Sequence, residues 1–134
     1  MNARPHEVHT AGNAVPPLDP ELAGLLDDLE DVHDEGIQLL CDGIRHIAVK
    51  RLTVDKTQTL AVTLAGSPDG TDVLTAIGLL AARILNADSN PALRTLSLTA
   101  QKTTQLHGEN LVRHLGDHEL HQHASNASGA IHTD

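Results

Sequence analysis

The sequence predicts a small α/β domain in which about three short strands are covered by three main helices. Two kinds of apolar spacing predict this fold. In some stretches apolar residues recur every three or four positions, as on one face of an amphipathic helix. In others they alternate with polar residues, often threonine, as in a half-buried strand. The two patterns follow one another along the chain, which favours parallel strands joined by helical crossovers.

The alternative fold class is an all-α helical bundle. In that fold the threonine-rich stretches are helical despite the weak helix propensity of threonine, whose branched side chain loses rotamer freedom in a helix.

One folded domain is expected between two loose ends. The chain has 134 residues, which is the size of a single domain. Residues 1–17 are polar and end in a proline pair, and residues 117–134 are rich in His, Ser, Asn and Gly, so both segments are predicted to be disordered. The single globular domain is therefore predicted to span residues 18–116.

Three helices are predicted within this domain. The first begins at the Asp-Pro-Glu of residues 19–21, where aspartate can cap and proline fits the first turn, and it runs to about residue 47 unless Gly36 splits it. The second runs from a cap at residue 71 or 72 to about residue 86. The third spans residues 104–115, before Gly116, which suits the left-handed end of a helix. The second helix has its apolar positions at Val73, Leu74, Ile77, Leu80, Ala81, Ile84 and Leu85.

Three strands are predicted where the spacing alternates, at residues 50–55, 59–64 and 94–100. A loop rich in Gly, Pro and Asp follows the second of them. A further alternative is a non-repeat α/β domain in which residues 50–55 and 59–65 form a hairpin.

Two of these segments share a further pattern. VKRLTV (49–54) and LRTLSL (93–98) both have apolar residues at their first, fourth and sixth positions, and each follows an amphipathic helix. This is the L-x-x-L-x-L core of a leucine-rich repeat, and NPALRTLSLTAQ (90–101) resembles the ribonuclease-inhibitor class. The resemblance covers residues 34–115. It implies a leucine-rich-repeat-like fold in which the residues between the apolar ones face outward on a concave strand surface.

The outward positions of those strands are the predicted binding residues. The expected function is a non-enzymatic protein–protein interaction module or adaptor, which binds another protein or self-associates to complete its core. No catalytic residue and no cofactor are predicted. The predicted contact residues are Arg51, Thr53, Asp55, Thr95, Ser97 and Thr99.

Composition restricts the classes of partner. Lys and Arg number 9 against 18 Asp and Glu, and the formal net charge of −9 disfavours nucleic acid and anionic membrane surfaces. Phe, Trp and Tyr are absent, so no aromatic platform exists for stacked bases. Cys41 is the only cysteine, which suits a reducing compartment. With no signal-peptide-like start and no membrane-spanning stretch, a soluble, cytoplasmic protein is expected.

The histidines suggest an alternative function. The chain has 10 of them, and neutral imidazole binds transition metals. The alternative is a His-based metal-binding protein that uses His33, His107 and His114. A helical structural subunit of a larger assembly is the remaining possibility.

Overall fold

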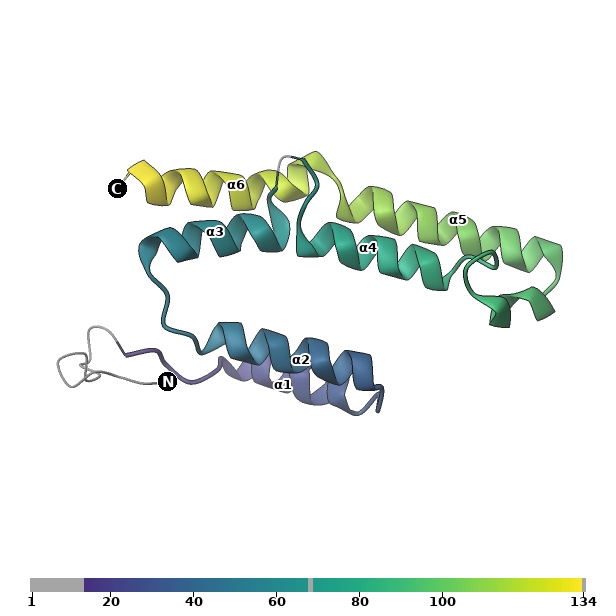
Figure 1. The fold of residues 1–134 in the computed structure, drawn as a ribbon, viewed down its shortest axis with the longest axis horizontal. Helices are drawn as coiled ribbons and strands as arrows, with labels where there is room; N and C mark the ends of the chain where they lie inside the picture. Colours follow the sequence, from purple (N-terminus) through teal and green to yellow (C-terminus); the bar gives the residue numbers. More distant parts are fainter. Residues whose placement is uncertain (1–13, 68, 134) are drawn as a thin grey trace. The chain divides into compact units, whose positions relative to one another are not determined.

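The structure is a computed structural model, and it describes residues 14–67 and 69–133. These described residues form helices and loops and contain no β-strand (Figure 1). The predicted leucine-rich-repeat-like α/β fold is therefore wrong, and the alternative all-α fold is the one observed. The helices are α1 (Pro20–Glu30), α2 (Glu35–Ala48), α3 (Val54–Ala65), α4 (Val73–Ile84), the 3-10 helix η2 (Pro91–Thr95), α5 (Leu98–Leu115) and α6 (His118–Thr133).

The predicted strands at 50–55 and 94–100 instead cover loops and helix ends, and the one at 59–64 lies within a helix; hydroxyl side chains fit these positions. Thr53 caps α3 and Ser97 caps α5, each accepting a hydrogen bond at 3.1 Å from the backbone N–H three residues later. Residues 59–64 lie inside α3. In that helix the hydroxyls of Thr57 and Thr59 donate to backbone carbonyls four residues earlier, at 2.8 and 3.1 Å. The alternation of threonine with apolar residues therefore reflects caps and carbonyl-bonded hydroxyls, not the two faces of a strand.

The chain divides into two compact units, Met1–Leu52 (unit 1) and Thr53–Asp134 (unit 2). The boundary falls inside the single domain predicted over 18–116. The predicted loose tail, 117–134, consists largely of α6. Of the predicted N-terminal arm, residues 14–17 have no regular secondary structure, and residues 1–13 lie outside the described residues.

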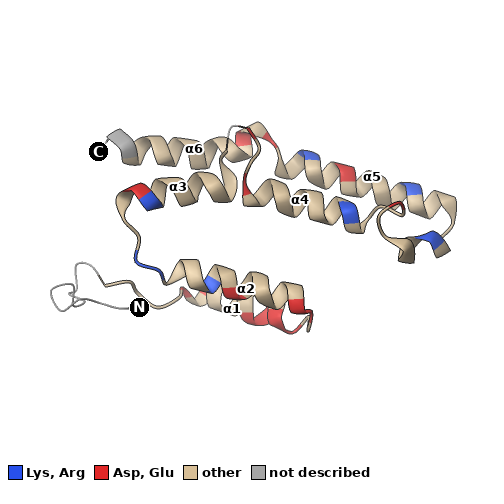
Figure 2. Cartoon of the chain, in the orientation of Figure 1, with Lys and Arg blue, Asp and Glu red and all other residues tan. Residues whose placement is uncertain are grey.

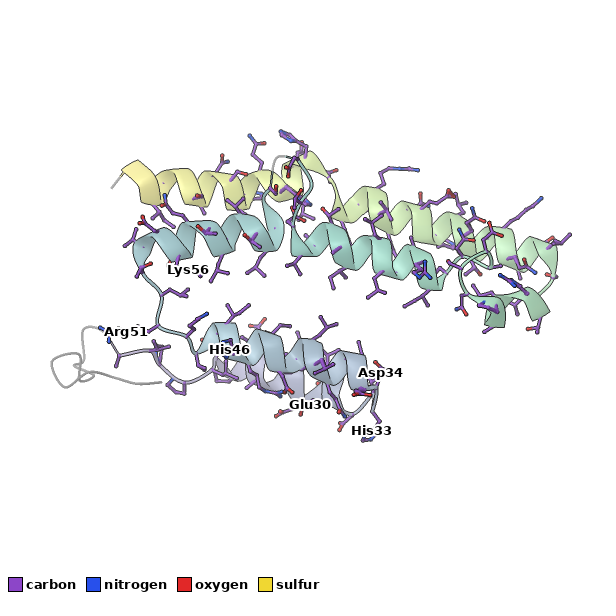
Figure 3. The ribbon with its side chains drawn as sticks, in the orientation of Figure 1. Glu30, His33, Asp34, His46, Arg51 and Lys56 are labelled. Atoms are coloured by element: carbon purple, nitrogen blue, oxygen red, sulfur yellow. The ribbon has the colours of Figure 1, made fainter. Side chains whose placement is uncertain are left out.

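Unit 1 is a hairpin of α1 and α2. The helix predicted over this region is split, but not at Gly36: the break comes at His33, whose φ of 59° lies in the left-handed region where a helix cannot continue. Asp34 then caps α2, and both residues lie at the turn (Figure 3). The side chains that the hairpin buries are Leu26 and Cys41, each 1% exposed. Its hydrophobic core is therefore very small.

Arg45 links the two helices of unit 1 electrostatically. From α2 its guanidinium reaches Glu30 and Asp27 of α1, the latter at 3.2 Å, and it lies 3.8 Å from Asp42 on its own helix. Acidic residues gather at the α1–α2 turn (Figure 2), so this cation offsets part of their mutual repulsion. Because the groups are largely solvated, the network contributes modestly to stability.

Unit 2 is an antiparallel pair of broken helices (Figure 1). The first rod is α3 followed end to end by α4, and the second rod is α5 followed by α6. The second rod runs back along the first, so α4 packs on α5 and α3 on α6. Asp72, one of the two predicted cap residues, caps α4. Gly116 ends α5 as predicted, although its φ is −95° and not left-handed.

Glycines allow the two rods to approach closely. A Cβ on Gly78 of α4 would lie 3.3 Å from the Leu115 side chain, and a Cβ on Gly108 of α5 would lie 3.1 Å from the Cα of Ala82. At the end of α3, a Cβ on Gly66 would lie 2.6 Å from the Cβ of Ala124 in α6. The contact between the rods is therefore made where glycines admit the backbone and the leucine and alanine side chains of the facing helix.

We predict that Gly66→Ala destabilises unit 2 by about 1–3 kcal/mol, because the added methyl group forces α3 and α6 apart. The matched control is Gly129→Ala in α6, where a Cβ meets no atom within 4 Å. That change should stabilise by about 0.5–1 kcal/mol, since alanine is the better helix former. Urea unfolding followed by circular dichroism measures both. A Gly66→Ala protein as stable as wild type would contradict the close contact.

Candidate functional site

The six predicted contact residues do not form one surface. Five of them belong to unit 2, where the start of α3 and the start of α5 lie at opposite ends of the rods (Figure 1). The strand surface on which they were expected is absent from the described residues. Arg51 lies between α2 and α3 (Figure 3), Thr53 and Asp55 lie at the start of α3, and Thr95, Ser97 and Thr99 lie around the start of α5.

The histidines proposed as metal ligands also lie on different elements of the structure. His33 lies at the turn of unit 1, and His107 and His114 lie on α5 of unit 2. Over the described part of the chain, no group of three or more His, Cys, Asp or Glu side chains is placed to hold a metal ion. The structure therefore offers no preformed site there for the metal-binding alternative.

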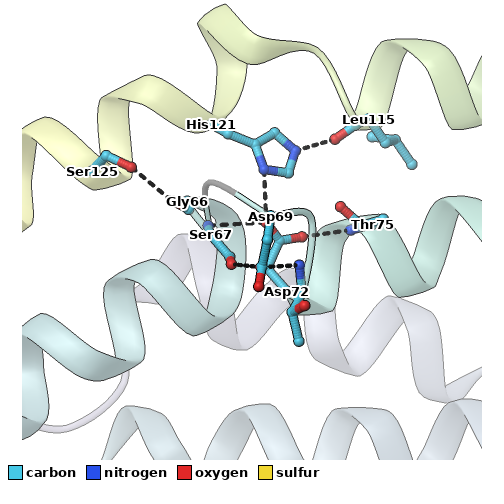
Figure 4. Close-up of polar contacts among 9 residues, drawn as sticks. Gly66, Ser67, Asp69, Asp72, Thr75, Leu115, His121 and Ser125 are labelled. Atoms are coloured by element: carbon cyan, nitrogen blue, oxygen red, sulfur yellow. Dashed lines mark hydrogen bonds and ion pairs between the residues drawn. The ribbon is translucent and has the colours of Figure 1, made fainter.

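A buried ion pair joins the two rods where both are broken (Figure 4). Nδ1 of His121, on α6, lies 2.7 Å from Oδ2 of Asp72, the cap of α4. The other ring nitrogen, Nε2, contacts the backbone carbonyl oxygen of Leu115 at the end of α5. The side chain of Asp72 is fully buried, and His121 is 7% exposed. One imidazole thus bridges α4, α5 and α6.

Further hydrogen bonds fix this pair in place. Asp72 accepts the backbone N–H of Thr75 at 2.8 Å and that of Ser67 at 3.2 Å, so its carboxylate both caps α4 and holds the preceding loop. The hydroxyl of Ser125, on α6, donates to the carbonyl of Gly66 at 2.6 Å. The loop between α3 and α4 is therefore attached to α6 at two points.

The surroundings of His121 determine its charge. The Leu115 carbonyl can only accept a hydrogen bond, and the Asp72 carboxylate accepts one when it is ionised, so this geometry favours a cationic imidazole with a proton on both nitrogens. The hydrogen bond to the Leu115 carbonyl and the charge of Asp72 together raise the pKa of His121, although burial opposes this. Burial likewise opposes ionisation of Asp72, but the hydrogen bonds from Thr75 and Ser67 and the His121 charge lower its pKa.

The pair does not resemble a catalytic Asp–His arrangement in its chemistry. A general base needs an unprotonated ring nitrogen directed at a nucleophile, whereas Nε2 of His121 is directed at a carbonyl oxygen. The nearby Ser125 hydroxyl is bonded to the Gly66 carbonyl instead. A pocket of about 450 Å³ opens beside the pair, with Thr75 and His118 among its lining residues. The observed geometry fits a structural tie between the rods.

Sequence reasoning missed this pair for an identifiable reason. The sequence indicates Asp72 only as one of two possible helix caps, and His121 lies in the segment predicted to be disordered. The available signal was the spacing of His118 and His121 with the Leu at 120, which continues a helical pattern past Gly116.

A second feature is an exposed aliphatic surface on α4. At 100° per residue, Val73, Ile77, Leu80 and Ile84 fall on one side of the helix, and they are 36–52% exposed. We call these four residues the α4 stripe. The residue that contacts α5, Gly78, lies about 130° around the helix from the centre of the stripe. The single apolar face predicted for this helix is thus divided between a covered side and an uncovered side.

The α4 stripe carries no negative charge in a strongly acidic chain. Residues 73–84 include no Asp or Glu, and Arg83 is the one charged residue among them (Figure 2). Unit 1 also leaves aliphatic side chains exposed, but its charges are close by at the α1–α2 turn. The exposed large aliphatic residues of α1 and α2 are Leu25, Leu39, Leu40 and Ile44.

No protein-family model matches the chain, and comparisons with curated proteins and with solved structures also give no match. Among the described residues, no helix combines the length and the apolar character needed to cross a bilayer.

We predict that His121→Gln lowers the free energy of unfolding by about 1.5–3 kcal/mol at acidic to neutral pH, because a charged hydrogen-bonded group is lost. The sign of the pH dependence follows from the raised pKa of His121. Its contribution is fully present below its ordinary pKa of 6.5 and is lost as the pH rises through the higher folded-state pKa. The difference between wild type and variant should therefore shrink with increasing pH.

Unfolding curves from about pH 5 to about pH 9, followed by circular dichroism, measure this difference. His118→Gln is the matched control, since His118 is exposed on the same turn of α6 and should leave the profile unchanged. If His121→Gln lowered stability equally at every pH, the charged state of the imidazole would be excluded.

Proposed function

We propose that the protein is a non-enzymatic protein-interaction module that binds another protein chain through the exposed aliphatic surface of α4. The observation that carries this proposal is that α4 has a wide apolar surface, of which α5 covers one part and leaves the α4 stripe exposed. The partner is expected to present an aliphatic helical surface of its own, because the α4 stripe offers no charged or hydrogen-bonding side chain.

The physical argument is the cost of leaving such a surface in water. A helix that is hydrophobic around its circumference is normally buried, and contiguous aliphatic patches on a soluble chain mark interaction sites. Completing the burial of a half-exposed Val, Leu or Ile side chain stabilises a complex by about 1 kcal/mol. The four residues of the α4 stripe together favour association by several times that amount before the entropic cost of binding.

The distribution of charge supports a protein partner over a phosphate-bearing one. The net charge of −9 repels nucleic acid and anionic lipid at long range. The acidic cluster at the α1–α2 turn lies in unit 1. In unit 2, Arg83 is the only charged residue of α4. An uncharged partner surface can therefore approach α4 without desolvating carboxylates on that helix.

We predict that Leu80→Glu abolishes capture of the partner from a lysate of the native host, because it places a carboxylate in the middle of the α4 stripe. Leu79→Glu is the matched control: Leu79 is 56% exposed on the same helix but lies outside the stripe. Quantitative mass spectrometry compares the proteins retained by wild type and by the two variants. Equal retention by all three would contradict the proposal.

A further inference from the structure

We infer that the partner of the α4 stripe is the same stripe on a second copy of this chain, in antiparallel orientation. This inference rests on the proposed function and names its partner. The decisive observation is the spacing of the four exposed residues: the steps from Val73 to Ile77, to Leu80 and to Ile84 are four, three and four positions. That series reads the same from either end of the helix.

A palindromic series complements itself about a two-fold axis. With the axis between Ile77 and Leu80, Ile77 packs against Leu80 of the partner subunit, and Val73 packs against Ile84 of the partner subunit. Every member of the stripe then has an apolar partner. Alternating steps of four and three are also the spacing of helices that pack side by side at a shallow angle. Such an interface is isologous, so it closes at a dimer.

The charges around the stripe favour the antiparallel direction. Two chains of net charge −9 repel one another, and α4 is a surface on which they can meet without opposing carboxylates. The exposed Arg83 near the end of α4 then lies beside the loop before α4 of the second copy, which carries the exposed Asp69. A parallel pair would place the two arginines side by side and also align the helix dipoles.

The length of α4 limits the strength of the dimer. Twelve residues of helix span about 18 Å. One such helix per copy buries less than the roughly 1,200–2,000 Å² of a stable interface. We therefore expect a reversible dimer whose population rises with protein concentration and with salt, since salt screens the repulsion between the acidic chains.

Disulfide cross-linking tests the register directly in the full chain, with Cys41 replaced by alanine. Ile77→Cys and Leu80→Cys are made separately, and one carries a mass tag. Under mild oxidation each variant alone should give little dimer, and the mixture should give the disulfide between position 77 of one copy and position 80 of the other. Homodimeric disulfides within each separate variant, or no cross-link above that of a Leu79→Cys control, would overturn the inference.

Sedimentation velocity over a range of concentrations provides the second measurement. Wild type and Leu79→Glu should shift from monomer towards dimer with increasing concentration, whereas Leu80→Glu should stay monomeric with the same helical circular dichroism. A wild-type chain that remains monomeric throughout would overturn the dimer. The proposed function would still stand if Leu80→Glu selectively lost a different protein from the host lysate, so the two failures are distinguishable.

Discussion

Two helices that lie side by side can each bury only one face, and this constraint governs both units of the chain. In unit 2 the rods meet through Gly66, Gly78 and Gly108, where the backbones approach closely and few large side chains are enclosed. In unit 1 the hairpin encloses little more than Leu26 and Cys41. Aliphatic residues that a globular core would cover are therefore left on the outside. The exposed α4 stripe, on which the proposed interaction depends, follows directly from how little a pair of helices can bury within unit 2.

The rods of unit 2 remain aligned because polar groups act where apolar burial is weak. Both rods are interrupted near Asp72 and Gly116, and at that level their backbone groups lose helical partners. The Asp72 carboxylate and the His121 imidazolium satisfy several of those groups while neutralising one another. A charged, hydrogen-bonded pair is directional, so it fixes the position of α6 in a way that aliphatic contacts alone do not.

These two features have separate roles. The Asp72–His121 pair lies at the break between the rods and holds the unit together, whereas the α4 stripe extends along the side of α4 that α5 does not cover. In the proposed interaction, the internal contacts of unit 2 set its geometry, and a second apolar surface completes the burial of α4. Association then removes apolar surface from water, as packing within the chain does.

The sequence by itself determined the local signals: the proline-led start of α1, a cap for α4 at residue 71 or 72, the end of α5 at Gly116 and the lack of Phe, Trp and Tyr. It left the threonine-rich stretches undecided, since threonine alternating with leucine fits either a strand face or a helix with caps and carbonyl-bonded hydroxyls. Only the tertiary structure decided which apolar side of α4 is covered, and it alone brought Asp72 and His121 together across 49 positions of the sequence. Periodicity records that a side chain is apolar, but burial and ion pairing depend on neighbours that are distant in the chain.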